Sequence, residues 1–221
     1  MIWKLSGVIA AVVSTAIFSG CETTPRTDAA RTGPFFTPTN VRGVDRLPAT
    51  LRRVAMLPTA GLSSIPEESL TRLDQALMAE LNRTARAEAV PVSRDVLARL
   101  SNSRQLESTE ALPHDLLSKL KTYTQADAVL FTDITTYSPY PPLALGLRAR
   151  LVDLATGETL WAFDNLFDAT HPAVANAARR HYLNTSPAAS GSADLSSTVL
   201  QNPTRFGAYV GSAMFSTLPP R

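Results

Sequence analysis

Two neighbouring runs of alternating residues, 143–153 and 159–167, constrain the fold of this chain more than any other feature. In the first run, leucines and an alanine at every second position alternate with glycine, arginines and a valine, as in a strand with one apolar face. The loop LATGE joins the runs, and its Gly157 can adopt the positive φ that a tight turn needs. The sequence therefore predicts an antiparallel β-hairpin with one buried face.

Strand and helix patterns alternate upstream of this hairpin. The expected elements are a strand at 53–58, a helix from a Ser64 N-cap to Leu81, a short strand at 90–92 kept near the sheet edge by Pro91, a helix capped by Ser93, a helix around 116–120 and a strand at 128–137. Helices at 172–183 and 203–216 follow the hairpin, separated by a flexible stretch at 184–202. This order predicts a single three-layer α/β domain, in which helices cover both faces of the sheet.

The only cysteine of the chain, Cys21, stands where an N-terminal apolar run ends. The run from Leu5 to Phe18 is shorter than the roughly 20 residues that cross a bilayer, and it fits the apolar core of a secretory signal. The residues Phe18-Ser19-Gly20-Cys21 resemble the lipobox of bacterial lipoproteins, with Phe18 in place of the usual leucine. In that family the cysteine thiol carries a diacylglycerol, the signal is cut before it, and the new amine is usually acylated.

The lipobox resemblance implies a signal peptide at 1–20, a lipid anchor at Cys21 and a location in the cell envelope facing the periplasm. Two or three acyl chains hold a protein on a membrane durably. Glu22, in place of an aspartate, favours the outer membrane. The alternative is a secreted or signal-anchored protein with an incidental cysteine. The proline-containing, aperiodic residues 21–50 predict a flexible tether, followed by the α/β domain at 51–218.

Charge and composition narrow the class of partner. The net charge of +2 includes Lys4, which a signal peptide would remove, and the arginines are scattered rather than gathered in a stripe. A continuous basic stripe is the footprint of nucleic-acid binding, so we expect no nucleic-acid partner. No cysteine follows Cys21, so the domain must be stabilised by packing rather than by an internal disulfide.

The stretch LGLRARLVDLATGETLWAFD, at 145–164, follows RVAMLP, VPVSRDVL and ADAVLFTDI in the chain. This order resembles the curli-secretion lipoprotein, the penicillin-binding-protein activator lipoproteins and similar flagellar lipoproteins over about residues 50–170. The resemblance implies a Rossmann-like, three-layer α/β domain with a mixed sheet. It also implies that this domain is periplasmic, is tethered by lipid and acts by protein contact, either binding an envelope enzyme or assembling into rings. The segment 137–147 is too short and proline-rich for a membrane strand, so we expect no pore. We expect Trp161 to pack in the core.

Catalytic motifs are not apparent in the sequence. The histidines His114, His171 and His181 form no His-Glu-x-x-His motif, and capping explains Asp168 and His171 better than metal binding does. Ser190 lies in no strand-turn-helix elbow. Three aspartates near predicted strand ends could serve catalysis but are expected to be solvated: Asp127, Asp133 and Asp153. We therefore expect neither a metal nor a cofactor, and no enzymatic activity.

The segment Tyr137-Ser138-Pro139-Tyr140-Pro141-Pro142 is either a stiff connector packed on the domain or an interaction surface built on its two tyrosines. Arg148 and Arg150, on one face of the same hairpin, are either a partner-facing pair or charges that keep a strand soluble. The predicted function is non-catalytic protein binding, assembly or regulation in the envelope, with an oligomer possible. The alternatives are a ring-forming component of a secretion or transport assembly, and an unrecognised hydrolase that uses Asp and His.

Overall fold

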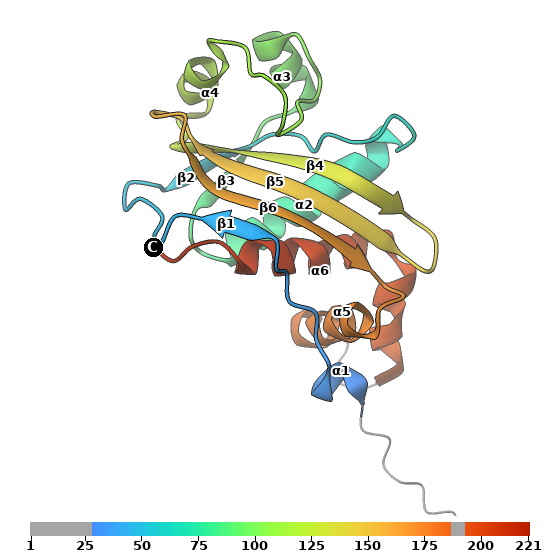
Figure 1. Ribbon diagram of the computed structural model, residues 1–221. Coiled ribbons are helices and arrows are strands. Elements are labelled where there is room, and N and C mark those ends of the chain that lie inside the picture. The colour runs from blue at the N-terminus through green and yellow to red at the C-terminus, as the bar shows by residue number, and fades with distance from the viewer. Residues whose placement is uncertain (1–27, 187–192) are drawn as a thin grey trace, which may run out of the picture.

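The computed structural model describes residues 28–186 and 193–221 (Figure 1). Cys21, the predicted signal peptide and Ser190 lie outside the described residues. The strands are β1 (Val41–Gly43), β2 (Arg53–Met56), β3 (Glu88–Pro91), β4 (Ala128–Ser138), β5 (Ala144–Asp153) and β6 (Thr159–Asp168). The helices are α1 (Ala29–Thr32), α2 (Glu67–Arg83), α3 (Arg94–Ser101), α4 (Leu116–Thr124), α5 (Pro172–Thr185), the 3₁₀ helix η2 (Ala193–Gln201) and α6 (Pro203–Ser216).

The strands form one mixed sheet in the order β1-β6-β5-β4-β2-β3. β2 pairs in parallel with β3 and with β4, whereas the pairs β4–β5, β5–β6 and β6–β1 are antiparallel. Helices α3 and α4 lie on one face of the sheet, and α2, α5 and α6 lie on the other (Figure 1). The predicted three-layer α/β fold with a mixed sheet is confirmed.

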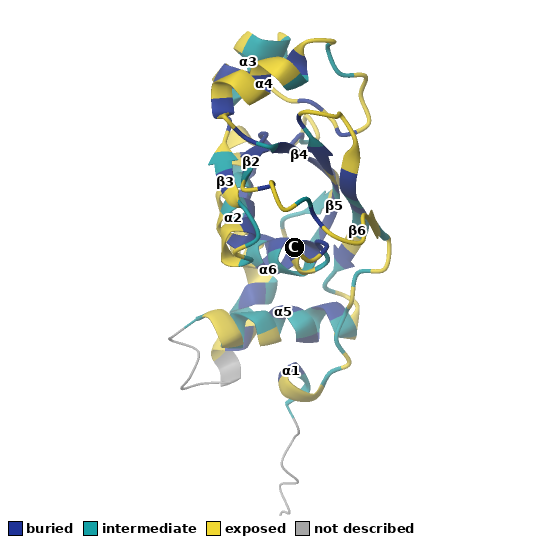
Figure 2. Ribbon diagram, turned by 90° about the vertical axis from the view of Figure 1, so that its left-hand side faces the viewer, coloured by how far each residue is buried: buried dark blue, intermediate teal, exposed yellow. Residues whose placement is uncertain are grey.

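Each face of the sheet has its own apolar core (Figure 2). The larger core joins the leucines of α2 to α6 and to one face of the hairpin. The smaller core joins α3 and α4 to the opposite face of β2 and β4. In α2 the leucines at positions 70, 73, 77 and 81 are all buried, as their three- and four-residue spacing predicts.

The hairpin of β5 and β6 confirms the alternation read from the sequence. Leu145, Leu147 and Leu151 are buried in the larger core, while Arg150 between them is exposed. Gly157 has a φ of +74°, and the Asp153 carboxylate accepts the turn N–H groups of Ala155 and Thr156 at 2.7 and 3.0 Å. The period of two therefore sets both the strand and its buried face.

Trp161 lies fully inside the larger core, as expected. Its ring stacks on Phe163 at 5.7 Å between centroids and on Phe215 of α6 at 6.5 Å. Its indole Nε1–H donates to the Thr217 hydroxyl at 3.2 Å, so its one polar atom is satisfied.

Residues 28–50 pack on the α/β domain, although the sequence predicts that the domain begins at residue 51. The Asp28 carboxylate pairs with Arg179 of α5 at 3.0 Å, Phe36 packs edge-on against Phe167 at 5.1 Å, and β1 pairs with β6. Leu47 is buried in the larger core. Isolated apolar side chains anchor this segment without the periodicity that marks a helix or strand. A flexible tether remains a prediction for residues 21–27 only.

Two further segments differ from expectation. The helix α2 begins at Glu67, with Pro66 rather than Ser64 in the N-cap position and no side-chain cap. Residues 193–201, expected to be flexible, form η2, because Val199 is buried in the larger core and orders the turn around it. In both cases a local composition cue gave way to packing.

Candidate functional site

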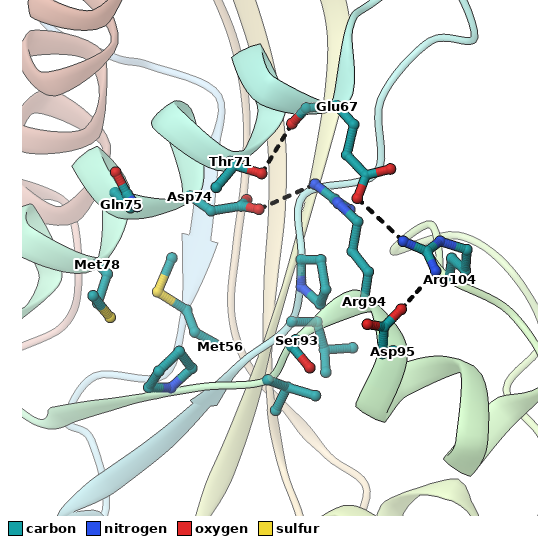
Figure 3. A pocket seen from close by; sticks show the side chains of 14 residues that line it. Met56, Glu67, Thr71, Asp74, Gln75, Met78, Ser93, Arg94, Asp95 and Arg104 are labelled. Atoms are coloured by element: carbon teal, nitrogen blue, oxygen red, sulfur yellow. Dashed lines mark hydrogen bonds and ion pairs between the residues drawn. The ribbon is translucent and has the colours of Figure 1, made fainter.

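A cleft of about 390 Å³ opens between α2 and α3 (Figure 3). It lies at the carboxyl ends of β2 and β3, where the chain leaves the two parallel strands toward opposite faces of the sheet. Such a point is the usual position of a binding crevice in an open α/β sheet. The topology therefore makes this cleft a candidate binding site.

An ion pair closes the inner wall of the cleft. Arg94, the first residue of α3, pairs with Asp74 of α2 at 3.1 Å and donates to the Thr59 carbonyl at 3.2 Å. The other oxygen of Asp74 accepts the Thr59 N–H at 2.8 Å. Burial raises the pKa of the Asp74 carboxyl, and the hydrogen bonds from Thr59 and the charge of Arg94 oppose that shift. The three residues tie the loop after β2 to both helices.

A second set of charges lies at the mouth of the cleft. The guanidinium of Arg104 pairs with Asp95 at 2.6 Å and with Glu67 at 3.1 Å (Figure 3). On the other side of the Asp74–Arg94 pair from Arg104, the lining includes Met56 and Met78 (Figure 3). The two arginines are paired with three carboxylates, so the described lining leaves no positive charge free, and the cleft suits an uncharged or apolar group better than an anion.

The lining of the cleft supplies no nucleophile–base pair among the described residues. The hydroxyl of Ser93 accepts the Val96 N–H at 3.2 Å as the predicted cap of α3, and no histidine lines the cleft. Nucleophilic catalysis needs a base within hydrogen-bond reach of the nucleophile. The described lining of the cleft therefore holds no arrangement of this kind.

The free edge of the sheet beside this cleft is blocked. The N–H groups of Glu88, the first residue of β3, and of Val92, directly after it, point inward, toward the carbonyls of Arg52 and Met56 at 2.7 and 2.9 Å. The outward N–H of Ala89 donates to the Asn82 side chain at 2.8 Å, and Pro91 has no N–H. Addition of a partner strand at this edge is therefore disfavoured.

A wide groove of about 670 Å³ lies between the β4–β5 loop and the first turns of α2 and α6. Tyr137 and Tyr140 both line it. Tyr137 also packs against the larger core, whereas Tyr140 is 79% exposed. The loop is thus both a packed connector, through Tyr137, and a surface feature, through Tyr140.

Arg148 and Arg150 lie on the opposite face of the sheet from these tyrosines. Arg148 pairs with Asp164 of β6 at 3.0 Å. Arg150 donates to the Thr159 hydroxyl at 2.9 Å and to the Ser108 carbonyl at 3.2 Å. The structure therefore does not bring the four predicted surface residues together, and both arginines have partners within the domain.

Each of the three aspartates expected at strand ends holds backbone groups. Asp127 accepts the N–H groups of Arg52 and Arg53 at 2.8 and 3.0 Å, and Asp153 organises the hairpin turn. Asp133 differs most from expectation. It lies inside β4, is only 5% exposed, and accepts both the N–H, at 2.8 Å, and the hydroxyl of Ser108. Burial raises the pKa of the Asp133 carboxyl. The prediction that this side chain is solvated is therefore wrong.

The histidines are dispersed. His114 precedes α4, and His171 occupies the N-cap position of α5 without a side-chain cap bond. Asp168 instead accepts the Thr170 N–H at 2.8 Å, and hydrogen bonds from Thr170 lower the pKa of its carboxyl. His181 lies on α5 beside the ring of Tyr209. Within residues 28–186 and 193–221, no group of three or more His, Cys, Asp or Glu side chains could hold a metal ion.

Comparison with known proteins gives similarities of structure alone. No family model matches the sequence, and no curated protein matches it at a significant level. A PelC dodecamer structure from Paraburkholderia phytofirmans has 14% identity and a TM-score of 0.43 over 82% of this chain and 98% of that one. Lipoprotein GNA1162 from Neisseria meningitidis has 20% identity and a TM-score of 0.38, over 52% and 79% of the two chains. The LpoB C-terminal domain from Salmonella enterica has 16% identity and a TM-score of 0.36, over 52% and 81%. None of these similarities assigns a function.

None of the helices within residues 28–186 and 193–221 is both long and apolar enough to cross a membrane.

Proposed function

We propose that this chain is a lipoprotein anchored at Cys21, facing the periplasm, that works without catalysis by binding a protein in the cell envelope. The observation that carries the proposal is the lipobox-like Phe18-Ser19-Gly20-Cys21 at the end of a short apolar run, with the only cysteine of the chain. The outer membrane is the proposed location because Glu22 follows the cysteine.

The groove beside Tyr140 is the proposed partner surface. Exposed tyrosines supply a large contact area at a small cost in conformational entropy, and they are enriched among residues that dominate binding energy. The prolines around Tyr140 stiffen its loop, and the Ser138 hydroxyl donates to the Tyr140 carbonyl at 3.3 Å. Little ordering is then needed on binding. The paired charges of the α2–α3 cleft and the blocked edge of β3 favour this groove over either of them.

Mass spectrometry of the native protein tests the anchor. We expect a mature chain that begins at Cys21 and carries fatty acyl chains, found in the membrane fraction. The Cys21→Ala variant should lose the acyl mass and leave the membrane fraction. An unmodified Cys21 on an uncut leader would overturn the anchor.

Crosslinking in intact envelopes tests the partner surface. We expect Tyr140→Ala to lose a crosslinked envelope protein that Tyr123→Ala retains. Tyr123 is a matched control because it is also an exposed tyrosine, 55% exposed, and lies on α4. Equal crosslinking in both variants would remove the groove from the proposal. Crosslinks only between copies of this chain, with a matching increase in detergent-solubilised mass, would favour ring assembly instead.

A further inference from the structure

The first described residues are fixed firmly to α5. Asp28 pairs with Arg179 at 3.0 Å, and Ala30 of α1 is fully buried. The Asn176 side chain donates to the Pro34 carbonyl at 3.2 Å, and the Phe36 N–H donates to the Ala173 carbonyl at 3.1 Å. Figures 1 and 2 both place α1 beside α5, at the end of the molecule opposite α3 and α4. The chain therefore enters the domain at one defined end.

Only a short segment separates that entry point from the proposed anchor. Residues 22–27 are six residues, so seven Cα–Cα steps join Cys21 to Asp28. A fully extended chain of that length spans at most about 25 Å. If Cys21 is acylated, as the proposed function requires, Asp28 cannot lie farther than that from the lipid headgroups. The α1–α5 end must then face the membrane closely.

The chemistry of this end suits a phospholipid surface. We define the basal surface as Asp28–Phe36, α5, η2 and Arg205. Its sequence holds four arginines against two aspartates, Asp28 and Asp194, and Asp28 pairs with Arg179 at 3.0 Å and with Arg31 at 4.0 Å. Among these, Arg31, Arg180 and Arg205 are exposed. Leu195 adds an apolar side chain that is 41% exposed.

The positions of Arg180 and Arg205 leave the charge of both side chains available, and Arg31, although paired with Asp28, has a side chain that is 77% exposed. Arg180 lies over the Phe35 ring at 4.4 Å, and Arg205 lies over the Tyr182 ring at 5.1 Å. These contacts orient the guanidinium groups without neutralising them. Basic side chains near a membrane are attracted to anionic lipid headgroups within a Debye length of the surface.

We propose that the basal surface docks on the anionic phospholipid bilayer that holds the acyl chains. This docking fixes the orientation of the domain, with α3, α4 and the α2–α3 cleft directed away from the membrane. The proposal rests on the lipid anchor of the proposed function. It adds that the domain has one preferred pose, rather than moving freely around its tether.

Fluorescence quenching in vesicles tests the pose on the full acylated chain. Because acylation occupies the thiol of Cys21, a cysteine introduced elsewhere is the only free thiol available for a dye. Asn184→Cys places the dye on α5, and Lys121→Cys places it on α4; both residues are exposed. The vesicles contain phosphatidylethanolamine, phosphatidylglycerol and a lipid with a spin-labelled headgroup. We expect quenching several-fold stronger at position 184 than at position 121.

Charge reversal tests the electrostatic part. Arg31→Glu should reduce the quenching at position 184 several-fold, as should high salt or replacement of phosphatidylglycerol by phosphatidylcholine. Arg99→Glu is the matched control, because Arg99 is an exposed arginine on α3 and its reversal changes the net charge equally. Quenching that falls equally in both variants would overturn the electrostatic docking.

Flotation with the vesicles separates the two levels of failure. If the wild-type chain does not float, the anchor fails, and the docking proposal fails with it. If the chain floats but the dyes at positions 184 and 121 are quenched equally, the proposed function stands and only the docking is overturned.

Discussion

The two faces of the sheet are covered to different extents. On one face, α2, α5 and α6 extend the larger core over the whole hairpin. On the other face, α3 and α4 cover β2 and β4, and beyond them Arg148 and Arg150 stand on β5. The difference shows that apolar packing holds the hairpin along its whole length on one side, whereas on the other side the smaller core reaches only its turn end, at Val152 and Leu154. The rest of this second side carries Arg148 and Arg150, and the loop around Ser108 contacts it through hydrogen bonds.

The largest expected effect lies on the fully covered face. Trp161→Ala removes a side chain that is fully buried between Phe163 and Phe215, and it should lower the free energy of unfolding by about 3–5 kcal/mol. Urea denaturation followed by circular dichroism measures this loss. A loss below about 1 kcal/mol would mean that the hairpin does not depend on α6 for its stability.

A pH dependence should follow from the rim of the same core. Burial first, and then the charge of Arg83, lower the pKa of His181 from 6.5 to about 4. The unfolded chain binds this proton below about pH 6.5 but the folded chain only below about 4. The contribution of neutral His181 to the free energy of unfolding is therefore complete above pH 6.5. As the pH falls toward 4 this contribution is lost, and the free energy of unfolding falls by up to about 3 kcal/mol.

The His181→Gln variant isolates this term. We expect its free energy of unfolding to fall less than that of the wild type between pH 7 and pH 4, in urea titrations at both values. Equal losses in the two proteins would assign the pH dependence to carboxylates elsewhere.

The polar face offers a test of intermediate size. Asp133→Asn keeps the shape of the side chain but removes one of the acceptors for the Ser108 N–H and hydroxyl, and it should cost about 1–3 kcal/mol. Hydrogen exchange should increase in the loop around Ser108 before it increases in β4. Unchanged exchange in that loop would show that Asp133 does not hold it.

The smallest expected effect concerns the Arg148–Asp164 pair. Both side chains are more than a third exposed, at 38% and 41%, so the pair should contribute about 0.2–1 kcal/mol. A double-mutant cycle with Arg148→Gln and Asp164→Asn measures this coupling. A coupling well above that range would mean that the polar face is held as firmly as the apolar one.

The sequence predicted those parts of the fold that leave a periodic signal. The alternation in β5 and the leucine spacing in α2 identified the elements and their buried faces, and Pro91 indicated the edge strand. The position of Asp133 had no such signal, because its partner Ser108 lies 25 residues away in an irregular loop.

The candidate sites were less predictable than the elements around them. The Asp74–Arg94 pair joins two helices across 20 residues, and only the strand topology brings them together. Phe35 and Phe36 did carry a usable cue, since aromatic residues in an apparent tether tend to pack on their own domain. Here Phe36 packs on Phe167 of β6, and Arg180 of α5 lies over the Phe35 ring. The acylation of Cys21 remains a prediction.

The Asn82 side-chain amide protects the edge strand β3 by accepting the Ala89 N–H. Proteins confined to a two-dimensional surface meet their own copies far more often than proteins free in solution, and an unprotected sheet edge is a template for aggregation. One amide oxygen on the Ala89 N–H and one proline ring at position 91 remove both outward donors of β3. When many such molecules crowd side by side, pairing of their sheets through β3 would then be disfavoured, so a high surface density need not seed fibrils from this edge.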